Sequence, residues 1–323
     1  MAPRFLNASY SLLSYAARRS SGISAAAPLP PAISIELTSI CNLHCPECVT
    51  GAGLLSRGNG FLDYTLAGKI ADELGGFVLS AWLSFQGEPM LHPDFFRITD
   101  LFARMNPVIA TNGHYLDRER CIGLADSPLK KIIISYDGVS SATYGIYRRG
   151  GDHELVSEGI RRLAATIRER HSGLRIVLQF LLHRGNEHEV RAAAAFAGSV
   201  GAGFRTKSMQ VLDPARAGEW VSPDDLRARY VRGDDGGWQP AGSPGRGCLR
   251  MWTSAVITSD GEVVPCCFDK HAVHPMGNLN SQSFAEIWRS RRYRDFRAAV
   301  MRSREAVDIC RDCPQGRRLL FRR

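Results

Sequence analysis

Three cysteines lie within one short segment, with the spacing Cys41-x3-Cys45-x2-Cys48. Thiolates this close together on one loop can hold three corners of an iron–sulfur cube and leave the fourth iron without a protein ligand. An iron left open in this way can bind and activate a substrate. Zinc is the competing interpretation, with His44 as its fourth ligand, although the spacing differs from that of the usual structural zinc sites. A disulfide fits three neighbouring cysteines poorly.

A second group of cysteines lies near the end of the sequence. Cys310 and Cys313 have C-x2-C spacing, and Cys248 and Cys266 precede them. Four thiolates are enough to ligate every iron of a 4Fe-4S cluster, and they could also hold one tetrahedral zinc ion. Cys267 directly follows Cys266 and would point the other way along an extended chain, so it is left out of the ligand set.

Short apolar segments alternate with amphipathic stretches along the chain. The apolar segments are residues 33–37, 82–85, 108–110, 132–135, 176–182 and 204–211, and the amphipathic stretches include 66–74 and 155–168. This alternation predicts an α/β protein with a parallel sheet covered by helices. Six units are too few for a closed eight-stranded barrel, so we expect a partial (β/α)6 barrel or an open sheet. Ligands should then gather at the carboxyl ends of the strands. Cys121 stands alone in an amphipathic stretch, which predicts a buried core thiol.

The composition changes along the chain and suggests four segments. We expect an N-terminal extension over residues 1–32, a partial barrel over 33–232, a Gly/Pro-rich linker over 233–247 and a small C-terminal domain over 248–323. In the last segment, residues 254–258 and 262–265 flank a turn and predict a hairpin. A capping box at Ser283 and Glu286 predicts a helix that runs to about Arg304.

The overall composition indicates a soluble globular protein. The chain has 323 residues, of which 44% are apolar and 23% charged. No apolar run is long enough for a membrane helix. Nine cysteines without a secretory leader indicate a cytoplasmic protein. The first 32 residues lack acidic side chains, which is also typical of an organelle transit peptide. A helix lying against the domain before the Pro-rich segment 28–31 is the favoured interpretation.

The net charge is +9, and residues 289–323 alone contain 12 Arg and 4 acidic residues. This excess indicates an acidic partner for that face.

Taken in order, these motifs closely resemble the radical S-adenosylmethionine (SAM) enzymes, in particular the branch with a C-terminal SPASM or Twitch domain. The further motifs that carry the resemblance are Phe85-Gln86-Gly87-Glu88-Pro89, similar to the family's GGEP motif, Thr111-Asn112-Gly113, Ser135-Tyr136-Asp137-Gly138, Gln179 and residues 186–189. The resemblance spans residues 33–316. No cysteine follows Cys313, which is similar to the Twitch type with one auxiliary cluster. Glu47 stands where many members have an aromatic residue.

The resemblance implies two sets of cluster ligands and a cofactor site. Cys41, Cys45 and Cys48 would ligate a 4Fe-4S cluster whose open iron binds SAM. The ligands of an auxiliary 4Fe-4S cluster would be Cys248, Cys266, Cys310 and Cys313. SAM would contact Gly87, Glu88, Asn112, Ser135 and Arg148. Glu88 would meet the methionine amine, Ser135 the ribose and Arg148 the carboxylate.

The resemblance also implies an activity. Reductive cleavage of SAM gives a 5′-deoxyadenosyl radical, which takes a hydrogen atom from the substrate while the protein orients the cofactor. A fully ligated auxiliary cluster suits electron transfer, which favours a net oxidation. We therefore expect a radical SAM oxidoreductase that acts on a sugar or aminocyclitol hydroxyl. The general base is not identified, although Arg148 and Lys207 are candidates.

Two other functions stay open. One is a maturase that modifies a ribosomal peptide or a protein side chain; it would need a separate recognition partner, because only about 32 residues precede the first strand. The other, less favoured, is an RNA-binding metal protein that uses the Arg-rich end of the chain. We expect instead that these arginines form a solvated face that docks an acidic flavodoxin- or ferredoxin-like electron donor. Neither a membrane nor a nucleic acid is an expected partner.

Overall fold

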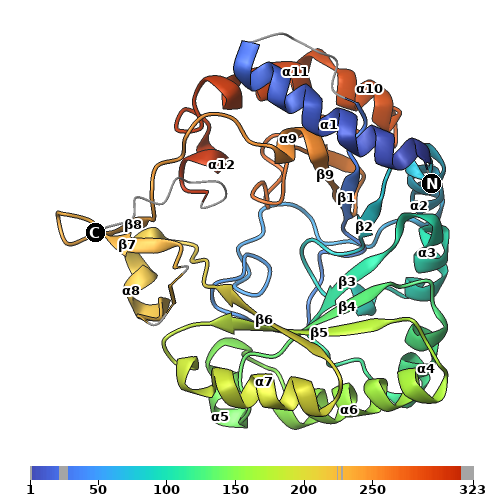
Figure 1. The fold of residues 1–323 in the computed structure, drawn as a ribbon, viewed down its shortest axis with the longest axis vertical. Helices are drawn as coiled ribbons and strands as arrows, with labels where there is room; N and C mark the ends of the chain where they lie inside the picture. The colour runs from blue at the N-terminus through green and yellow to red at the C-terminus, as the bar shows by residue number, and fades with distance from the viewer. Residues whose placement is uncertain (1, 22–27, 224, 227, 314–323) are drawn as a thin grey trace.

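A nine-stranded sheet organises the chain (Figure 1), with the strand order β11-β10-β9-β1-β2-β3-β4-β5-β6. The computed structural model describes residues 2–21, 28–223, 225–226 and 228–313. The first six strands are β1 (Ala32–Ile35), β2 (Ser80–Trp82), β3 (Val108–Thr111), β4 (Lys131–Ser135), β5 (Arg175–Leu182) and β6 (Gly203–Ser208). Neighbouring strands among these six are parallel. The predicted α/β class and partial-barrel arrangement are confirmed.

Three strands differ from the sequence-based expectation. The strand expected over residues 33–37 ends at Ile35. The strand expected over residues 82–85 lies earlier, at Ser80–Trp82, because its pairing with β1 ends at the register Ser34↔Trp82. The strand expected over 204–211 ends at Ser208, opposite the last residue of β5. The apolar residues that follow the ends of β2 and β6 lie in loops, and they do not extend the hydrogen-bonded pairing of the strands.

Helices cover the outer side of this curved sheet (Figure 1). They are α2 (Tyr64–Leu74), α3 (Phe95–Leu101), α4 (Arg118–Asp126), α5 (Ser141–Tyr147), α6 (His153–Glu169) and α7 (Val190–Ser199), with short 3₁₀ turns at Pro89–Leu91, Ala103–Met105, Glu187–Glu189 and Pro214–Arg216. Aspartate side chains begin two of the longer helices, since Asp63 accepts from Leu66 N and Asp152 from Leu155 N. Side chains alternate along β4 and β5, so Ile134 and Phe180 enter the core under the helices. The intervening residues Ser135 and Gln179 lie on the inner face.

The C-terminal segment extends the same sheet. Strand β9 (Ser254–Ile257) pairs in parallel with β1 and antiparallel with β10 (Glu262–Val264), which in turn pairs with β11 (Gly277–Asn278). The predicted hairpin is therefore present. The sheet continues across the boundary expected between the barrel and the C-terminal domain, whose residue limits stay a prediction.

The helix expected from Ser283 to about Arg304 is two helices. The predicted capping box at Ser283 and Glu286 begins α10 (Phe284–Arg289). Ser290 then interrupts the helix and accepts from Tyr293 N at 3.1 Å to begin α11 (Arg291–Arg302). A serine with this capping role ends one helix and starts another. The last described helix is α12 (Asp308–Arg311), and the arginines at 317–323 lie outside the described residues.

The expected linker over residues 233–247 contains regular structure. Strand β7 (Tyr230–Arg232) pairs with β8 (Trp238–Pro240) in a small separate hairpin, which follows α8 (Ala217–Trp220). Gly233 N donates to Gly237 O at 2.7 Å across its turn. Some of the glycines in this segment therefore form the turn between β7 and β8.

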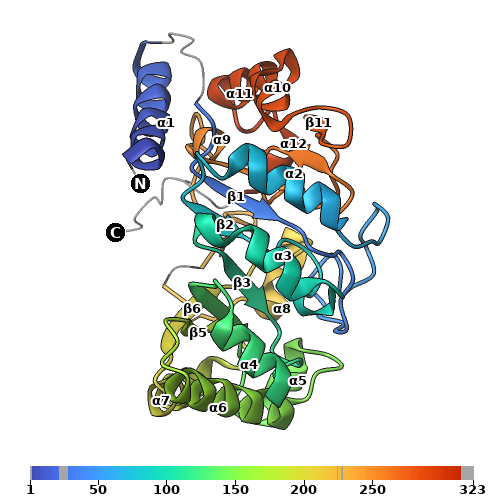
Figure 2. The same ribbon diagram turned by 90° about the vertical axis from the view of Figure 1, so that its right-hand side faces the viewer.

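The N-terminal helix α1 (Ala2–Ser21) packs against the short helix α9 (Arg250–Thr253), as Figure 2 shows. The rings of Tyr15 and Trp252 lie 5.3 Å apart, and Asn7 Nδ2 donates to Leu29 O at 2.7 Å. This agrees with the expected helix lying against the domain. None of the helices in the described ranges combines the length and apolar character that a membrane span requires.

Candidate active site

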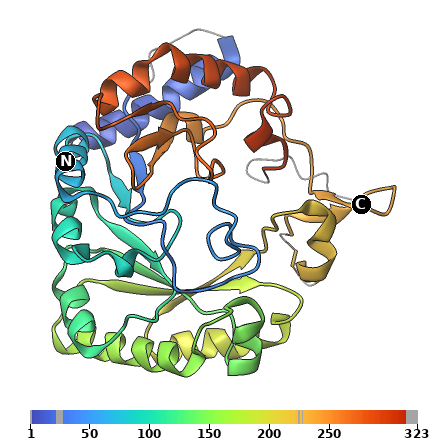
Figure 3. The ribbon, with the colours of Figure 1, turned by 180° about the vertical axis from the view of Figure 1, so that it is seen from behind.

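The loop that follows β1 lies inside the curve of the sheet (Figure 3) and carries Cys41, Cys45 and Cys48. Two backbone hydrogen bonds anchor it: Glu88 N donates to Ile40 O at 2.8 Å, and His44 N donates to Arg149 O at 2.9 Å. Gly51 closes the loop, because a Cβ atom there would lie 2.6 Å from Cys45 N. The segments that follow β2 and α5 thus hold the start and the middle of the cysteine motif.

The three thiols of this loop share one environment. Cys45 is buried beside Leu43, and Cys41 and Cys48 pack against the same apolar cluster. Burial raises the pKa of Cys41 to about 11; a hydrogen bond from Leu43 N opposes this rise, and the charges of Glu88 and the other two thiols add to it. Thiolates gathered here therefore need a compensating positive charge, which bound iron supplies.

A single zinc ion suits these ligands less well than a cluster. Among the residues that the structure describes, no three His, Cys, Asp or Glu side chains converge on one metal-ion position. His44, the fourth zinc ligand considered above, has an exposed side chain. Neither observation supports a closed zinc site at these three cysteines.

Glu88 joins the ends of the second and third strands. Its side chain is buried, and Oε1 accepts from the Thr111 hydroxyl at 2.7 Å and from Met90 N at 3.1 Å. Oε2 accepts from Asn112 N at 2.7 Å. Burial raises the pKa of Glu88, although these hydrogen bonds oppose the rise. Glu88 therefore holds two predicted cofactor-binding motifs together, and its contact with the methionine amine stays a prediction.

The remaining predicted SAM contacts lie at the same strand ends. Gly87 has a φ of +70°, and a Cβ atom there would lie 2.3 Å from Thr38 O, so this close approach requires glycine. Asn112 Nδ2 donates to Asn42 Oδ1 within the cysteine loop at 2.8 Å. Ser135 ends β4 on the inner face. Their contacts with SAM stay predictions.

Arg148 lies beside the cysteine loop and is already paired. Its Nε donates to Asp137 Oδ2 at 2.6 Å, and Nη1 approaches Cys45 Sγ at 3.8 Å. The other carboxylate oxygen of Asp137 accepts from Leu181 N at 2.7 Å. Arg148 therefore connects the end of β4 with a predicted cluster ligand. The expected contact with the cofactor carboxylate stays a prediction.

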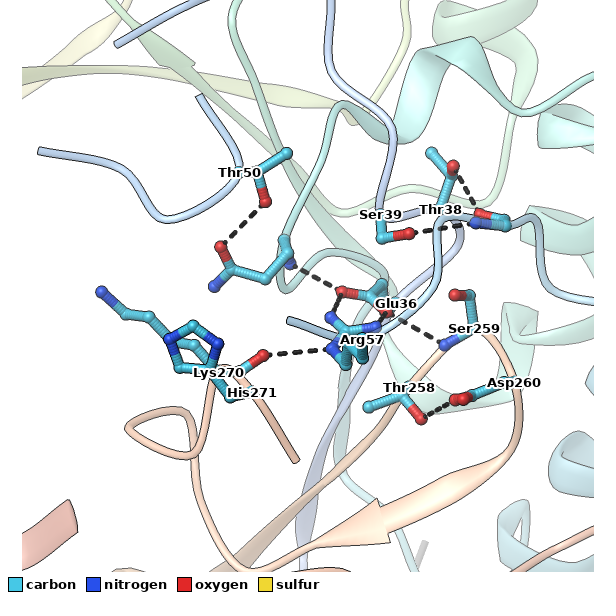
Figure 4. A network of polar contacts seen from close by, with 12 residues as sticks. Glu36, Thr38, Ser39, Thr50, Arg57, Thr258, Ser259, Asp260, Lys270 and His271 are labelled. Carbon is cyan, nitrogen blue, oxygen red and sulfur yellow. Dashed lines mark hydrogen bonds and ion pairs between the residues drawn. The ribbon is translucent and has the colours of Figure 1, made fainter. Parts of the chain in front are cut away.

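A buried ion pair between Glu36 and Arg57 lies where the cysteine loop meets the C-terminal hairpin (Figure 4). Arg57 Nη1 donates to Glu36 Oε2 at 2.7 Å, and that oxygen also accepts from Ser259 N at 3.0 Å. Glu36 Oε1 accepts from Gln86 N at 3.3 Å, while Arg57 Nε donates to Lys270 O at 3.0 Å. One carboxylate thus joins the first strand, the second strand end and the C-terminal segment.

The second set of predicted ligands also gathers. Cys266, Cys310 and Cys313 are buried, and Cys248 packs against the apolar cluster that contains Cys266 and Cys310. Burial raises the pKa of Cys310 to about 12, with contributions from Cys313 and Cys248. Burial likewise raises the pKa of Cys266, which Cys267, Cys310 and Cys313 also influence. Cys310 thus interacts with Cys248 and Cys313, and Cys266 with Cys310 and Cys313. Four neighbouring thiols suit the chemistry of a fully ligated cluster, and their ligand roles stay predictions.

The other two cysteines are not among the predicted ligands, although Cys267 lies beside Cys266. Cys267 Sγ accepts from Arg250 Nη1 at 3.4 Å. Cys121 is fully buried in the main core, as expected, and its thiol lies 3.5 Å from Leu116 O.

Several site residues were not found from the sequence. Glu36 and Arg57 are 21 positions apart, and no local pattern pairs them. Gly51 follows Cys48 closely, and its proximity to the motif was the available signal. Lys207 was named only as a candidate base, although it lies among other cations.

Comparison with protein families agrees with this geometry. Residues 35–197 match the radical SAM superfamily, and residues 248–314 match SPASM, an iron–sulfur cluster-binding domain. The chain therefore belongs to the radical SAM superfamily and has a SPASM-type C-terminal domain. A SAM-binding 4Fe-4S cluster, SAM and auxiliary cluster binding follow from these two domains.

Individual relatives are more distant. The chain is 29% identical over 294 residues to a PqqA peptide cyclase from Gluconobacter oxydans (strain 621H), covering 81% of this chain and 77% of that protein. It is 24% identical over 291 residues to an S-adenosyl-L-methionine-dependent 2-deoxy-scyllo-inosamine dehydrogenase from Niallia circulans, covering 87% and 91%. The crystal structure of BtrN with AdoMet and 2-DOIA shares the fold, with a TM-score of 0.56, 20% identity and coverage of 88% and 93%.

Proposed function

We propose that this chain is a radical SAM oxidoreductase that converts an alcohol of a sugar- or aminocyclitol-like small molecule to a ketone. The observation that carries the proposal is the gathering of Cys248, Cys266, Cys310 and Cys313. Four thiolates leave no iron of a cube open to substrate, so that the auxiliary cluster is suited to accept an electron. Similarity to the inosamine dehydrogenase along most of both chains supports this choice.

The chain's own residues have defined tasks in this proposal. When bound, SAM and its cluster supply the hydrogen-atom abstraction. Cys41, Cys45 and Cys48 would hold that cluster, while Arg148 places a positive charge beside Cys45. Glu88 keeps the neighbouring strand ends aligned. For each alcohol converted to a ketone, the substrate loses one hydrogen atom, one proton and one electron. The electron goes to the auxiliary cluster.

Isotope transfer tests the proposal. Anaerobically reconstituted enzyme would be incubated with SAM, a reductant and candidate alcohols deuterated at the carbinol carbon, including 2-deoxy-scyllo-inosamine. We expect deuterium in 5′-deoxyadenosine and a matching amount of ketone. A Cys310→Ala, Cys313→Ala double variant should still form 5′-deoxyadenosine but lose most of the ketone. Undiminished ketone formation by that variant would refute the electron-transfer role.

Peptide modification is the second candidate, and the 29% identity to a peptide cyclase favours it. A peptide substrate predicts that 5′-deoxyadenosine formation rises only when a peptide is supplied, and that mass spectrometry finds a modified peptide and no small-molecule ketone. The same isotope experiment with deuterated peptides therefore separates the two candidates.

We also propose that an acidic flavodoxin- or ferredoxin-like donor docks on α11. This helix exposes Arg291, Arg292 and Arg294, whereas Val300 on its other side packs beside Cys266 and Cys310. Complementary charge would bring the donor close to the auxiliary thiols. Donor-driven turnover should fall steeply with salt, while turnover driven by a small chemical reductant should not. Equal salt dependence with both reductants would exclude this docking site.

A further inference from the structure

Three cationic side chains lie near one another toward the inner side of the sheet: Lys207 of β6, Arg229 before β7 and Lys270 after β10. Lys207 is opposite Leu181 of β5 in the strand register, and Leu181 belongs to the apolar cluster that contains Cys45. Because side chains alternate along β6, Lys207 and Phe204 lie on opposite faces, and Phe204 packs against the helix-covered core. Lys207 therefore faces the cysteine loop.

The three cations influence one another. Burial lowers the pKa of Lys207 to about 8, and the charges of Arg229, Arg148 and Lys270 contribute to this shift. Burial also lowers the pKa of Lys270, with a further contribution from Arg229. Lys207 is nevertheless exposed, and Lys270 is half-buried. Each lysine is thus close to other positive charges and accessible to a small molecule.

This group lies between the two sets of thiols. Lys270 interacts electrostatically with Cys48 of the first set, and Arg229 with Cys313 of the second. In the proposed oxidation, the substrate would give a hydrogen atom to the 5′-deoxyadenosyl radical formed at the first set and an electron to a cluster held by the second. The cations therefore lie in the region where such a substrate would bind.

Neither lysine has a directly bonded partner in the described part of the chain, although the negative charge of a Cys267 thiolate would act on both and Cys48 and Glu47 act on Lys270. No hydrogen bond or ion pair joins Nζ of Lys207 or Lys270 to another described residue, and Figure 4 shows the Lys270 side chain extending away from the Glu36–Arg57 pair. Glu47 contributes only weakly at Lys270, and one of its oxygens already accepts from Leu212 N at 2.7 Å. Because neither ammonium group has a bonded partner, both are available to pair with an anionic ligand.

We propose that Lys207, Arg229 and Lys270 bind an anionic group of the substrate, a carboxylate or a phosphate, between the two clusters. The inference rests on the proposed alcohol oxidation and narrows its substrate to a sugar acid or a sugar phosphate. An amine-bearing aminocyclitol would meet like charges at this position, so the cations also select against it. Lysine and arginine are the side chains expected for such an anion.

Binding to the reconstituted holoenzyme with SAM tests this without requiring turnover. Calorimetric titration would compare glucose 6-phosphate, glucuronate, glucose and glucosamine, which differ mainly in charge. We expect at least one of the two anions to bind about tenfold or more tightly than glucose, and glucosamine to bind most weakly. Comparison of the affinities for glucose 6-phosphate and glucuronate shows whether the site prefers a phosphate or a carboxylate.

Substitutions of the lysines test whether these cations cause the preference for anionic ligands. Lys207→Met and Lys270→Met should each weaken binding of the preferred anion about tenfold or more. Lys207→Arg, which keeps the positive charge, should retain most of the affinity. Lys130→Met, at an exposed lysine preceding β4, is the matched control and should bind normally. Iron content and thermal unfolding would show that each variant is folded and loaded with clusters.

The outcomes separate this inference from the proposed function. Equal binding of charged and neutral probes, tighter binding of glucosamine, or absence of any binding in the millimolar range would overturn the anion site. Lysine variants that shift cluster potentials but leave anion binding unchanged would also overturn it. Anion binding that depends on the lysines, found together with no ketone product, would retain the site and reject the alcohol oxidation.

Discussion

Arg148 contacts both Asp137 and Cys45, with Nε 2.6 Å from a carboxylate oxygen of Asp137 and Nη1 3.8 Å from Cys45 Sγ. A buried carboxylate thus orients a positive charge toward a predicted cluster ligand. A positive charge at this distance stabilises the reduced, more negative cluster.

Arg148→Met should therefore lower the reduction potential of the SAM-binding cluster and slow 5′-deoxyadenosine formation. A redox titration followed by electron paramagnetic resonance measures the potential. Arg149→Met, at the exposed neighbouring arginine, is the control and should leave the potential unchanged. An unchanged potential in Arg148→Met would show that the contact with Cys45 has no electronic role.

Removing one partner of the Glu36–Arg57 pair should destabilise the protein strongly. Glu36→Gln leaves a buried guanidinium unpaired, with an expected loss of about 3–5 kcal/mol in the free energy of unfolding. Denaturant titration measures the loss. Glu219→Gln, in the exposed Arg216–Glu219 pair, should cause no comparable change. If both variants behave alike, the buried pair does not hold the C-terminal hairpin to the barrel.

Two glycines with nearly equal backbone angles should respond differently to alanine. Gly87 and Gly53 have φ values of +70° and +71°, but only Gly87 would place a Cβ atom against backbone, at Thr38 O. Gly53→Ala should cost about 1 kcal/mol through its backbone angle alone. Gly87→Ala should in addition displace the cysteine loop and lower iron content. Normal cluster loading in Gly87→Ala would contradict the close approach.

His183 should make the protein sensitive to mild acid. Burial is the main cause that lowers its pKa from 6.5 to about 4, so the unfolded chain binds the proton more readily than the folded chain does. Stability is therefore lost as the pH falls from 6.5 toward 4. Between about pH 7.5 and about pH 5.5 the loss from this group should be about 1.3 kcal/mol.

Unfolding titrations of the wild type and His183→Gln at those two pH values measure the contribution of His183. The pH-dependent loss should be smaller in the variant by about that amount. An identical pH dependence in both proteins would show that His183 is protonated equally well in the folded state.

The parts of the structure that depend on local patterns were predictable. Cysteine spacing indicated both thiol sets, alternation of apolar residues indicated the parallel strands, and Ser283 with Glu286 marked the start of α10. Contacts between distant segments were not predictable in this way. Glu36 with Ser259 and Lys207 with Lys270 come together only because β9 adds to the edge of β1.

The break between α10 and α11 at Ser290 was only partly predictable from the sequence. A serine three residues before Tyr293 is a recognisable capping signal, but the surrounding apolar and arginine pattern also fits one continuous helix. Trp288 and Tyr293 are both buried, and Arg297 lies over both rings. Tertiary packing decided between the two patterns.

We propose that Cys41, Cys45 and Cys48 hold one cluster and that a separate set of four thiols holds another. Iron and sulfide counting after anaerobic reconstitution of the wild type and of the Cys41/Cys45/Cys48→Ala variant tests it most directly. We expect about eight irons in the wild type and about four in the variant, with complete loss of 5′-deoxyadenosine formation. A triple variant that keeps its full iron content, or that still cleaves SAM, would contradict it.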